Sequence, residues 1–297
     1  MIGLEKLILG TVKLGLPDYG VNNLNKSYTD SNFEFLKQVN MLGINHYDTA
    51  PRYGESELVI GNYINNTNIN LNISTKVDNL FQNDKESINK IKLSATNSLK
   101  RLTVPKLHIL YLHQNDIEII RDKYIHEGLL KVKDIGLIKY IGASVYTINE
   151  CNAAIESGIF DYIQFPLNII DISIYNQLIK NYSGNVKFIA RSIYLQGLLN
   201  NTESSSLIPK FSTEISTYIN QLTTYSKKLN INLTDLARSF VFHLDKIDGY
   251  IIGTRNITNL KSNISFLDFN NEKFIFNELY TLSSNEKSWS NPRNWVK

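Results

Sequence analysis

Cysteine is almost absent from this sequence of 297 residues, in which Cys151 is the one example. A single thiol cannot close an internal disulfide, and it cannot supply the several sulfur ligands of a cysteine-based metal site. The five histidines show no spacing of the His-Glu-x-x-His kind that binds zinc. We therefore expect no disulfide framework and no metal site, and we interpret Cys151 as a packing residue.

Long hydrophobic runs and an excess of charge of one sign are missing too. No segment approaches the roughly 18 consecutive apolar residues of a transmembrane helix. The start of the chain, Met1 to Gly10, lacks the charged leader and apolar core of a signal peptide. Lys and Arg number 31 against 28 Asp and Glu, so the formal net charge is only +3. We expect a cytoplasmic protein that binds neither membranes nor nucleic acids.

A glycine-rich dinucleotide fingerprint is a further absence. No Gly-x-Gly-x-x-Gly follows a strand-like segment, so a Rossmann-type site has no support in the sequence. We find no internal repeat, low-complexity linker or break in composition. The hydrophobic fraction of 42% and the charged fraction of 20% are those of a globular protein with a sizeable core. We therefore expect one domain over residues 1–297.

What the sequence does contain is a regular alternation of strand-like and helical segments. The strand-like segments cover residues 7–11, 44–48, 72–76, 107–113, 139–144, 162–165, 186–192 and 250–253. The helical segments cover residues 31–42, 56–65, 85–102, 117–133, 147–157, 173–181, 211–229, 233–244, 257–266 and 272–279. In the third of these, Ile88, Ile91, Ala95 and Leu99 recur at the spacing of one helix face. Thr147 is placed to cap the N-terminus of its helix.

Units of one strand followed by one helix favour a closed parallel barrel. Parallel strands with helical crossovers must be covered on their outer face, and eight such units can close on themselves. The sequence therefore predicts an α/β protein with a (β/α)8 or TIM-barrel fold. An open, doubly wound sheet is the alternative, and the missing glycine fingerprint counts against it. In a TIM barrel the functional side chains lie at the C-terminal ends of the strands.

The stretch from Gly43 to Glu57 combines a strand with candidate catalytic residues. Residues 44–47 are apolar or aromatic and predict a buried strand, which Asp48 ends. Tyr53 follows in the loop, before a helix whose start carries the acidic Glu55 and Glu57. We interpret both glutamates as favourable charges at that helix N-terminus. Asp48 and Tyr53 could therefore face one cavity.

Lys76 and His113 end the next two strand-like segments. A free phenol has a pKa of about 10, so Tyr53 can donate a proton only with a cation nearby. Lys76, alone, would be an ordinary surface lysine, and His113 would be a core histidine. Inside a barrel, however, a lysine must find a counter-charge, and Asp48 is the candidate. Together the four residues predict one catalytic group.

These residues give the chain a close resemblance to the aldo-keto reductases. The string Gly-Ile-Asn-x-x-Asp-Thr-Ala-x-x-Tyr-Gly-x-Ser-Glu, residues 43–57, is highly specific, and later segments match in order over nearly the whole chain. The resemblance implies that Lys76, held by Asp48, makes Tyr53 a better acid. It also implies that His113 orients the carbonyl group of the substrate.

The resemblance extends to a nicotinamide cofactor. Residues 139–145 are similar to the family's fifth-strand motif, in which a serine and the asparagine after it bind the nicotinamide carboxamide. Ser144 matches that serine, whereas Val145 replaces the asparagine, so one carboxamide hydrogen bond is either missing or supplied by another residue. Gln164 matches the glutamine that meets the same group. The resemblance also assigns Gly10 and Thr11, at the end of the first strand, to the cofactor.

Residues 190–199 resemble the seventh-strand segment, in which an aromatic ring stacks on the nicotinamide. Arg191 stands there instead. A planar guanidinium can also stack on a π-face, and its charge disfavours the oxidised, cationic ring, which favours the reductive direction. The resemblance places Ser192, Leu195 and Gln196 near the pyrophosphate.

The segment from Ile251 to Asn263 resembles the part of the family that holds the adenosine end. Gly253 and Thr254 are expected to open a helix whose N-terminal amides suit a phosphate. Arg255 could pair with a 2′-phosphate, and Asn263 could reach the adenine. NADPH is therefore expected as the cofactor, with NADH as the alternative.

The resemblance implies an enzyme that reduces an aldehyde or ketone to an alcohol, with Tyr53 as proton donor and hydride from nicotinamide C4. One alternative is a cofactor-binding regulatory barrel of the channel-subunit kind, with little turnover. Another is a barrel lyase or isomerase that uses Lys76 as a Schiff base. The string from Ser144 to Tyr146 and residues 191–199 are similar to bacterial members linked to sugar or surface-polysaccharide metabolism. We expect a small-molecule carbonyl substrate, such as a sugar derivative, and a monomer.

Specificity in a barrel lies in its loops. The loops expected to choose the substrate cover residues 16–26, 79–84, 115–117 and the tail 284–297, which contains Trp289 and Trp295.

Overall fold

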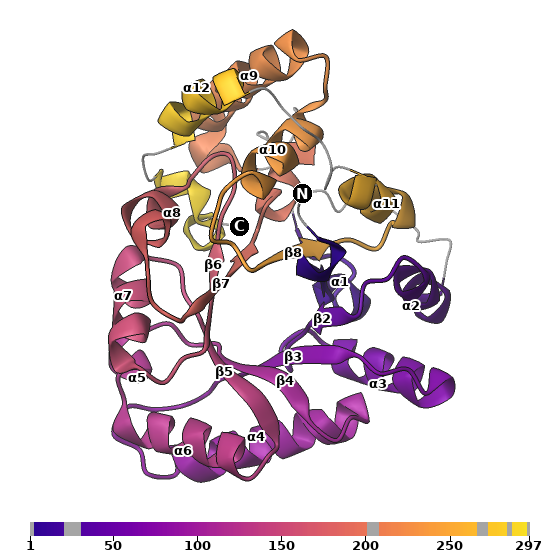
Figure 1. The fold of residues 1–297 in the computed structure, drawn as a ribbon, viewed down its shortest axis with the longest axis vertical. Coiled ribbons are helices and arrows are strands. Elements are labelled where there is room, and N and C mark those ends of the chain that lie inside the picture. The colour runs from indigo at the N-terminus through magenta and orange to yellow at the C-terminus, as the bar shows by residue number, and fades with distance from the viewer. Residues whose placement is uncertain (1–2, 21–30, 201–207, 266–272, 284–286, 296–297) are drawn as a thin grey trace.

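Eight parallel strands close into a barrel in chain order (Figure 1). The computed structural model describes residues 3–20, 31–200, 208–265, 273–283 and 287–295. The strands are β1 Leu7–Gly10, β2 His46–Asp48, β3 Asn72–Val77, β4 Leu107–Leu112, β5 Ile138–Ser144, β6 Tyr162–Pro166, β7 Lys187–Arg191 and β8 Gly249–Gly253. β1 pairs with β8 from Leu7–Tyr250 to Gly10–Gly253, so the sheet has no open edge. The predicted (β/α)8 barrel is confirmed, and the doubly wound sheet is wrong.

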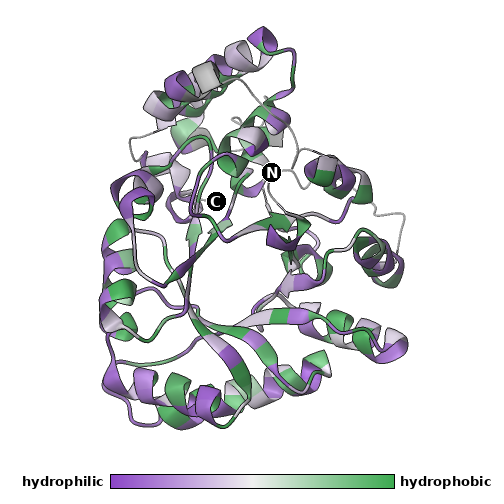
Figure 2. Cartoon of the chain, viewed as in Figure 1, coloured by the Kyte–Doolittle hydropathy of each residue, from purple (hydrophilic) through white to green (hydrophobic). Residues whose placement is uncertain are grey.

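Helices surround the barrel on its outer side (Figure 1). The α-helices are α1 Val12–Gly15, α2 Asn32–Met41, α3 Ser56–Thr67, α4 Ser87–Leu102, α5 Ile117–Ile120, α6 Lys123–Asp134, α7 Ile148–Ser157, α8 Ser173–Gln177, α9 Ser212–Lys228, α10 Leu233–Phe242, α11 Ile257–Ser265 and α12 Lys273–Ser283. Short 3-10 helices are η1 Leu4–Lys6, η2 Ile179–Asn181, η3 Leu195–Asn200, η5 Pro209–Phe211, η6 Ser288–Ser290 and η7 Pro292–Asn294. Figure 2 shows hydrophobic and hydrophilic residues alternating along these helices, as helices that cover a core require.

Every predicted strand is present, with ends that differ from the prediction by no more than two residues. The cap predicted at Thr147 is confirmed, because its side chain accepts from the Glu150 amide while the Glu150 side chain accepts from the amide of Thr147. The single helix predicted over 117–133 is wrong. Asp122 interrupts it, because its carboxylate accepts from the amides of Tyr124 and Ile125 and starts α6 as a new helix.

The helix predicted over 173–181 is shorter than expected, since α8 ends at Gln177 and a 3-10 turn follows. Parts of other expectations lie outside the described residues. They are the last residue of the helix predicted over 257–266, the first of that over 272–279, and residues 21–26, 284–286 and 296–297 of the expected specificity loops.

The inside of the barrel is filled by a small apolar cluster. Its buried members are Ile8, Ile109, Tyr111, Tyr162 and Ile189. Tyr111 fits against β5 because its neighbour there, Gly142, has no side chain. A methyl group on Gly142 would come within 2.3 Å of the tyrosine ring. The larger cluster lies between the strands and the helices and includes the fully buried Cys151, as expected for a packing residue.

Glu57 does more than place a charge at a helix N-terminus. Although it lies in the first turn of α3, its side chain is buried and pairs with Arg101 of α4. It also accepts a hydrogen bond of 2.6 Å from Thr75 of β3. The prediction of Glu57 as an acidic residue at the helix N-terminus is confirmed, but it is incomplete, because a buried carboxylate also needs specific partners. Glu55 is exposed at the N-cap of α3 and makes no side-chain cap bond.

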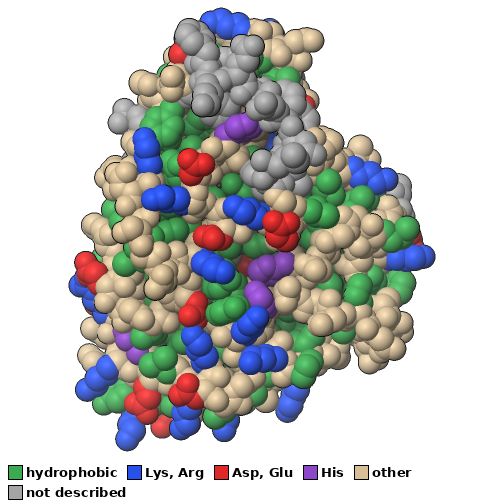
Figure 3. Space-filling model, viewed as in Figure 1, with side chains coloured by type: hydrophobic (Ala, Val, Ile, Leu, Met, Phe, Trp, Pro, Cys, Tyr) green, Lys and Arg blue, Asp and Glu red, His purple; other side chains and the backbone are tan. Residues whose placement is uncertain are grey.

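Charges of both signs are interspersed over the face of the molecule shown in Figure 3. Within the described ranges, no helix combines the length and the apolar character needed to cross a bilayer. The same part of the chain contains no cluster of His, Cys, Asp and Glu side chains arranged for a metal ion.

Gly61 lets two helices approach closely. A methyl group on Gly61 of α3 would lie 1.9 Å from the carbonyl oxygen of Arg101 in α4. The Gly61 carbonyl in turn accepts a hydrogen bond of 3.0 Å from Thr103, just after α4. Gly61→Ala should therefore push the helices apart and cost about 2 kcal/mol of stability. Thermal unfolding followed by circular dichroism should show a midpoint lowered by about 5 °C.

Asn62→Ala is the matched control for this variant. Asn62 is the exposed neighbour of Gly61 on the same helix, so its replacement should leave the midpoint within about 1 °C of the parent. Equal midpoints for the two variants would contradict the steric role of Gly61.

Candidate active site

A buried ion pair joins β2 and β3 at the C-terminal ends of the strands. The Lys76 ammonium lies 2.7 Å from Asp48 Oδ1 and donates to the Thr49 carbonyl at 2.8 Å. Gln164 of β6 donates to the other carboxylate oxygen of Asp48 at 2.9 Å. The Lys76 side chain is 1% exposed. Burial disfavours the ammonium, but Asp48 and then Tyr53 outweigh it and raise the pKa of Lys76, so the lysine is a fixed cation.

Tyr53 lies over this cation from the loop after β2. The Lys76 nitrogen is 4.9 Å from the centre of the Tyr53 ring. Burial raises the pKa of Tyr53, and the positive charge of Lys76 is the strongest of the influences that oppose the rise. The phenol therefore keeps its proton at neutral pH, next to a cation that stabilises the phenolate left when the proton is given up.

His113 completes the group from the end of β4. Its ring meets the Tyr53 ring edge-on, with 6.4 Å between the ring centres. Burial lowers the pKa of His113, against the opposing effect of the nearby Asp78 carboxylate. The imidazole is therefore neutral at physiological pH. The four residues predicted as one catalytic group lie together at one end of the barrel.

Close packing at the start of α3 places Tyr53. The Ser56 hydroxyl donates at 3.0 Å to the carbonyl oxygen of Thr11, and the Thr49 hydroxyl donates to Ser56 at 3.0 Å. Gly54 has a φ of +55°, and a methyl group there would come within 2.6 Å of the Gly15 carbonyl oxygen. The loop that carries Tyr53 can therefore lie directly against α1 only with glycine at position 54.

These side chains line a cavity of about 640 Å³, a volume typical of cofactor and ligand sites. All the predicted catalytic residues line it, and so do all the predicted cofactor residues except one. They are Asp48, Tyr53, Lys76, His113, Gly10, Thr11, Ser144, Gln164, Arg191, Ser192, Gln196, Gly253, Thr254, Arg255 and Asn263. The exception is Leu195, whose side chain is fully buried in the apolar core. The side chain of Leu195 therefore packs in the core, and its predicted place near the pyrophosphate stays a prediction for its backbone.

A model of the Aldo/keto reductase family matches residues 6–279 of this sequence. The chain belongs to the aldo/keto reductase family. It is therefore an NAD(P)H-dependent oxidoreductase that acts on carbonyl compounds, as the resemblance of residues 43–57 implied.

Two curated relatives of this reductase are sugar dehydrogenases by name. The D-arabinose 1-dehydrogenase of Saccharomyces cerevisiae is 26% identical over 243 residues, which cover 73% of this chain and 72% of the yeast protein. The L-galactose dehydrogenase of Arabidopsis thaliana is 23% identical over 246 residues, which cover 77% of this chain and 76% of the plant protein.

Solved structures share the barrel of this reductase at lower identity. An aldo-keto reductase from Bacillus halodurans, in its holo form, has a TM-score of 0.73 at 20% identity and matches 96% of this chain and 94% of its own. A glycerol dehydrogenase from Gluconobacter oxydans has a TM-score of 0.69 at 20% identity, with 95% and 93% of the two chains matched. These similarities show the fold.

The end of the cavity near α11, where the sequence predicted the adenosine, differs in detail from that prediction. α11 begins at Ile257, three positions after Thr254. The Asn256 side chain already accepts from the amides of Thr258 and Asn259, at 2.8 and 3.3 Å. Gly253 and Thr254 therefore do not open the helix directly. The amides of Thr258 and Asn259, which the Asn256 side chain caps, are not left for a phosphate. Asn263 is also engaged, since its amide nitrogen donates to Asn259 and its oxygen accepts from Tyr194.

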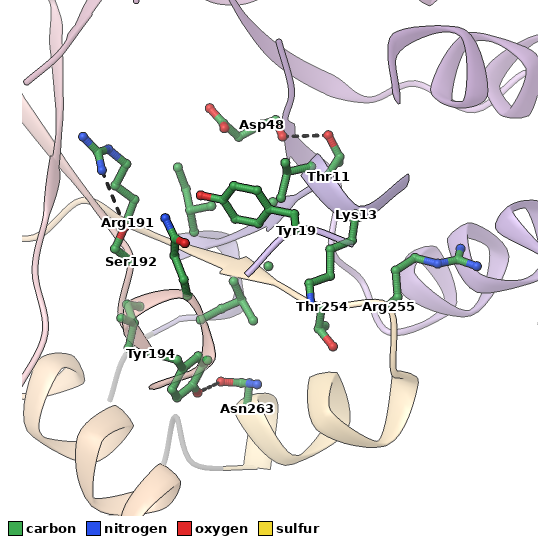
Figure 4. A pocket seen from close by; sticks show the side chains of 18 of the residues that line it. Thr11, Lys13, Tyr19, Asp48, Arg191, Ser192, Tyr194, Thr254, Arg255 and Asn263 are labelled. Carbon is green, nitrogen blue, oxygen red and sulfur yellow. Dashed lines mark hydrogen bonds between the residues drawn. The ribbon is translucent and has the colours of Figure 1, made fainter. Parts of the chain in front are cut away.

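Other residues also line the cavity, among them Lys13, Tyr19 and Arg238, which the sequence alone did not single out. Arg238 of α10 is 1% exposed and binds Asp235 and Ser262. Lys13 of α1 extends toward Thr254, and Tyr19 lies across the middle of the cavity (Figure 4). Only Arg238 leaves a signal in the sequence, because an arginine on the apolar face of a helix needs a buried partner.

Asp78 is another residue that sequence reasoning missed. It follows β3, two positions after Lys76, and its carboxylate lies 3.5 Å from His113 Nδ1 and pairs with Arg52. Its negative charge opposes the effect of burial on His113. Asp78→Asn should therefore lower the pKa of His113 further, because burial and the Lys76 charge then act with less opposition. Nuclear magnetic resonance titration of the His113 ring would measure this shift.

Asp84→Asn is the control for this titration. Asp84 is also an ion-paired carboxylate, but it pairs with Lys90 rather than with the histidine. The His113 titration should be the same in this variant and in the parent. A pKa of His113 that stays constant or rises in Asp78→Asn would contradict the role given to Asp78.

Proposed function

We propose that this aldo/keto reductase reduces an aldehyde or ketone with NADPH and that Tyr53 donates the proton. The observation that carries the proposal is the Lys76–Asp48 pair directly beside Tyr53 and His113, at one cavity. The cofactor supplies hydride from its nicotinamide C4 when it is bound. The protein supplies the proton, the charge that stabilises the developing alkoxide, and the position of the carbonyl group.

The proton transfer follows from the opposing effects of burial and of Lys76 on the pKa of Tyr53. Burial keeps the phenol protonated before the reaction, as a proton donor must be. Lys76 then stabilises the phenolate, and Asp48 and Thr49 hold the ammonium in place by hydrogen bonds of 2.7 and 2.8 Å. The fixed hydrogen-bond geometry means that little reorganisation accompanies the transfer.

His113 orients the substrate oxygen in this proposal. A neutral imidazole has one N–H donor. Nδ1 lies 3.5 Å from the Asp78 carboxylate, whose charge opposes the effect of burial, which lowers the pKa of His113. The proposed role requires the proton on Nε2, where it can be donated to the carbonyl oxygen beside Tyr53.

The residues of the cavity suit a dinucleotide phosphate. Gly253 at the end of β8 is exposed, and a methyl group there would meet nothing within 4 Å, so the backbone borders open space. Lys13, Thr254 and Arg255 lie together on the side of the cavity away from Arg191 (Figure 4). Arg255 stacks over the Phe35 ring at 5.1 Å. Two cations at this end support NADPH, with its additional 2′-phosphate, over NADH.

The Schiff-base alternative is opposed by the charge of Lys76. A lysine attacks a carbonyl group only as a neutral amine. The ion pair with Asp48 raises the pKa of Lys76 above its ordinary value, although burial acts the other way. The geometry therefore favours a fixed cation over a nucleophile.

A sugar derivative is the substrate class that the relatives support. Both curated relatives are named for sugars, D-arabinose and L-galactose. Such polyhydroxy compounds need hydrogen-bonding groups in the site, and Tyr19, Tyr146 and Gln164 line the cavity.

Tyr53→Phe tests the proton donor. The variant should lose about three orders of magnitude in kcat, because the reaction then lacks its general acid. The affinity for NADPH, measured by its fluorescence, should change by less than about threefold. Retention of most of the aldehyde-dependent oxidation of NADPH would show that Tyr53 is not the acid. Tight binding of NADPH without reduction of any aldehyde by the parent enzyme would favour the regulatory barrel.

Arg255→Gln tests the cofactor assignment. Its dissociation constant for NADPH should rise about tenfold or more, while that for NADH stays nearly constant, because only NADPH has the 2′-phosphate. Arg121→Gln is the control, since Arg121 is an exposed arginine paired with Glu156 and does not line the cavity. An equal loss of affinity for both cofactors would contradict the pairing of Arg255 with this phosphate.

A further inference from the structure

The charges that line the cavity are unevenly matched. The cationic side chains are Lys13, Lys76, Arg191, Arg238 and Arg255, whereas Asp48 is the one carboxylate on the described lining. Asp48 pairs with Lys76, and Asp235, behind the lining, pairs with Arg238. Lys13 and Arg255 lie on the side proposed for the cofactor phosphates. Arg191 is the cation on the other side, and no carboxylate of the described chain forms an ion pair with it.

The guanidinium of Arg191 is held at its face and at one edge. It extends from the end of β7 and lies 4.0 Å from the centre of the Tyr146 ring. One nitrogen donates to the Val145 carbonyl oxygen at 2.9 Å, and another lies 3.5 Å from the Ser192 hydroxyl. A guanidinium has five N–H donors in a fixed plane. These contacts leave several donors and one face of Arg191 for other groups.

A second arginine lies against the same Tyr146 ring. Arg293, in the short helix η7 near the C-terminus, lies 3.8 Å from the centre of the Tyr146 ring. Its guanidinium also donates to Asn115 at 3.2 Å. Two like charges therefore stand over one phenol, with no carboxylate paired to either in the part of the chain that the structure describes. Arg293 is exposed to solvent, whereas Arg191 lines the cavity, so Arg191 is the cation that a molecule in the cavity can reach.

Arg191 lies on the side of the cavity where the reaction takes place. Its positive charge lowers the pKa of Tyr53, although burial and Lys76 have larger effects. Figure 4 shows Arg191 across the cavity from Arg255, with the hydroxyl end of Tyr19 turned toward Arg191. An anion bound by Arg191 would therefore belong to a molecule next to the proton donor rather than to the adenosine end of the cofactor.

We propose that Arg191 binds an anionic group of the substrate, a carboxylate or a phosphate, and that this reductase acts on acidic carbonyl compounds. The inference rests on the proposed function, because it needs a carbonyl substrate beside Tyr53. It is compatible with a nicotinamide at Arg191, since the ring would use the free face of the guanidinium and the anion its free edge. Acidic and phosphorylated sugar derivatives fall within this class.

Matched pairs of aldehydes test this specificity. For the carboxylate, 4-carboxybenzaldehyde is compared with its neutral analogue 4-carbamoylbenzaldehyde. For the phosphate, glyceraldehyde 3-phosphate is compared with glyceraldehyde. The parent enzyme should have a kcat/KM at least about tenfold higher for the anionic member of one pair. The pair that shows the preference identifies the anion, and equal values within both pairs would overturn the proposal.

Arg191→Gln should bring the ratio of kcat/KM values within the preferred pair close to one. The ratio is the readout because an effect on cofactor binding is common to both members and cancels. Arg191→Lys should restore part of the ratio, since it keeps the charge but loses the planar donors. An unchanged ratio in Arg191→Gln would overturn the proposal.

Arg293→Gln is the matched control for the same charge removal. Arg293 is exposed and lies outside the cavity lining, so solvent screens its charge. Its variant should keep the ratio within about twofold of the parent value. An equal loss of the ratio in Arg293→Gln would show that Arg191 is not the specific ligand.

A binding experiment separates failure of this inference from failure of the proposed function. Calorimetry on the parent protein saturated with NADP⁺ compares the product alcohols of the preferred pair, which are 4-(hydroxymethyl)benzoate and 4-(hydroxymethyl)benzamide for the carboxylate, or glycerol 3-phosphate and glycerol for the phosphate. The anionic alcohol should bind at least about tenfold more tightly, and Arg191→Gln should remove the difference. Absence of turnover with every aldehyde would refute the reductase proposal, whereas equal binding of the two alcohols would refute the anion site.

Discussion

The buried pair of Lys76 and Asp48 is the interaction on which the site depends. An ammonium and a carboxylate removed from water are costly unless each is held by its partner and by further hydrogen bonds. Here Thr49, just after β2, and Gln164 of β6 supply these bonds. The closed sheet makes this possible, because β2, β3 and β6 all bring residues to the same end. The barrel thus gives the Lys76 cation its fixed position beside Tyr53.

The loop that holds Tyr53 is closely packed against residues 11–15. Thr11 and Ser56 are 45 positions apart in the chain, yet their side chains are 2.9 Å apart. This contact, together with Gly54 against Gly15, joins the loop after β2 to the loop after β1. This close approach explains why the loop after β2 carries the small or hydroxyl side chains of Thr49, Gly54 and Ser56. These short side chains let the backbones come together, while Asp48 and Tyr53 of the same stretch line the cavity.

The sequence predicted the barrel and the catalytic group for different physical reasons. Strand and helix periods are local, so the order of elements followed directly from residues such as Ile88 and Ile91, and strand ends placed Lys76 and His113 at one edge. Contacts that depend on loop conformation were missed. Asp78 faces His113 across the ends of neighbouring strands, and the side chain of Leu195, whose backbone φ is +45°, packs in the core. The sequence also gave no indication that the Asn256 side chain would cap α11.

The distribution of charge in the cavity depends on which strand ends carry charged residues. β2 and β3 supply a neutral pair, whereas the ends of β7 and β8 each bring an arginine, Arg191 and Arg255, without a carboxylate on the lining beside it. A dinucleotide placed between them would satisfy the cation at the β8 end with its phosphates. Its nicotinamide end carries no anion, so the charge at the β7 end would remain. An anionic substrate could then balance Arg191, whose guanidinium is positioned against the Tyr146 ring.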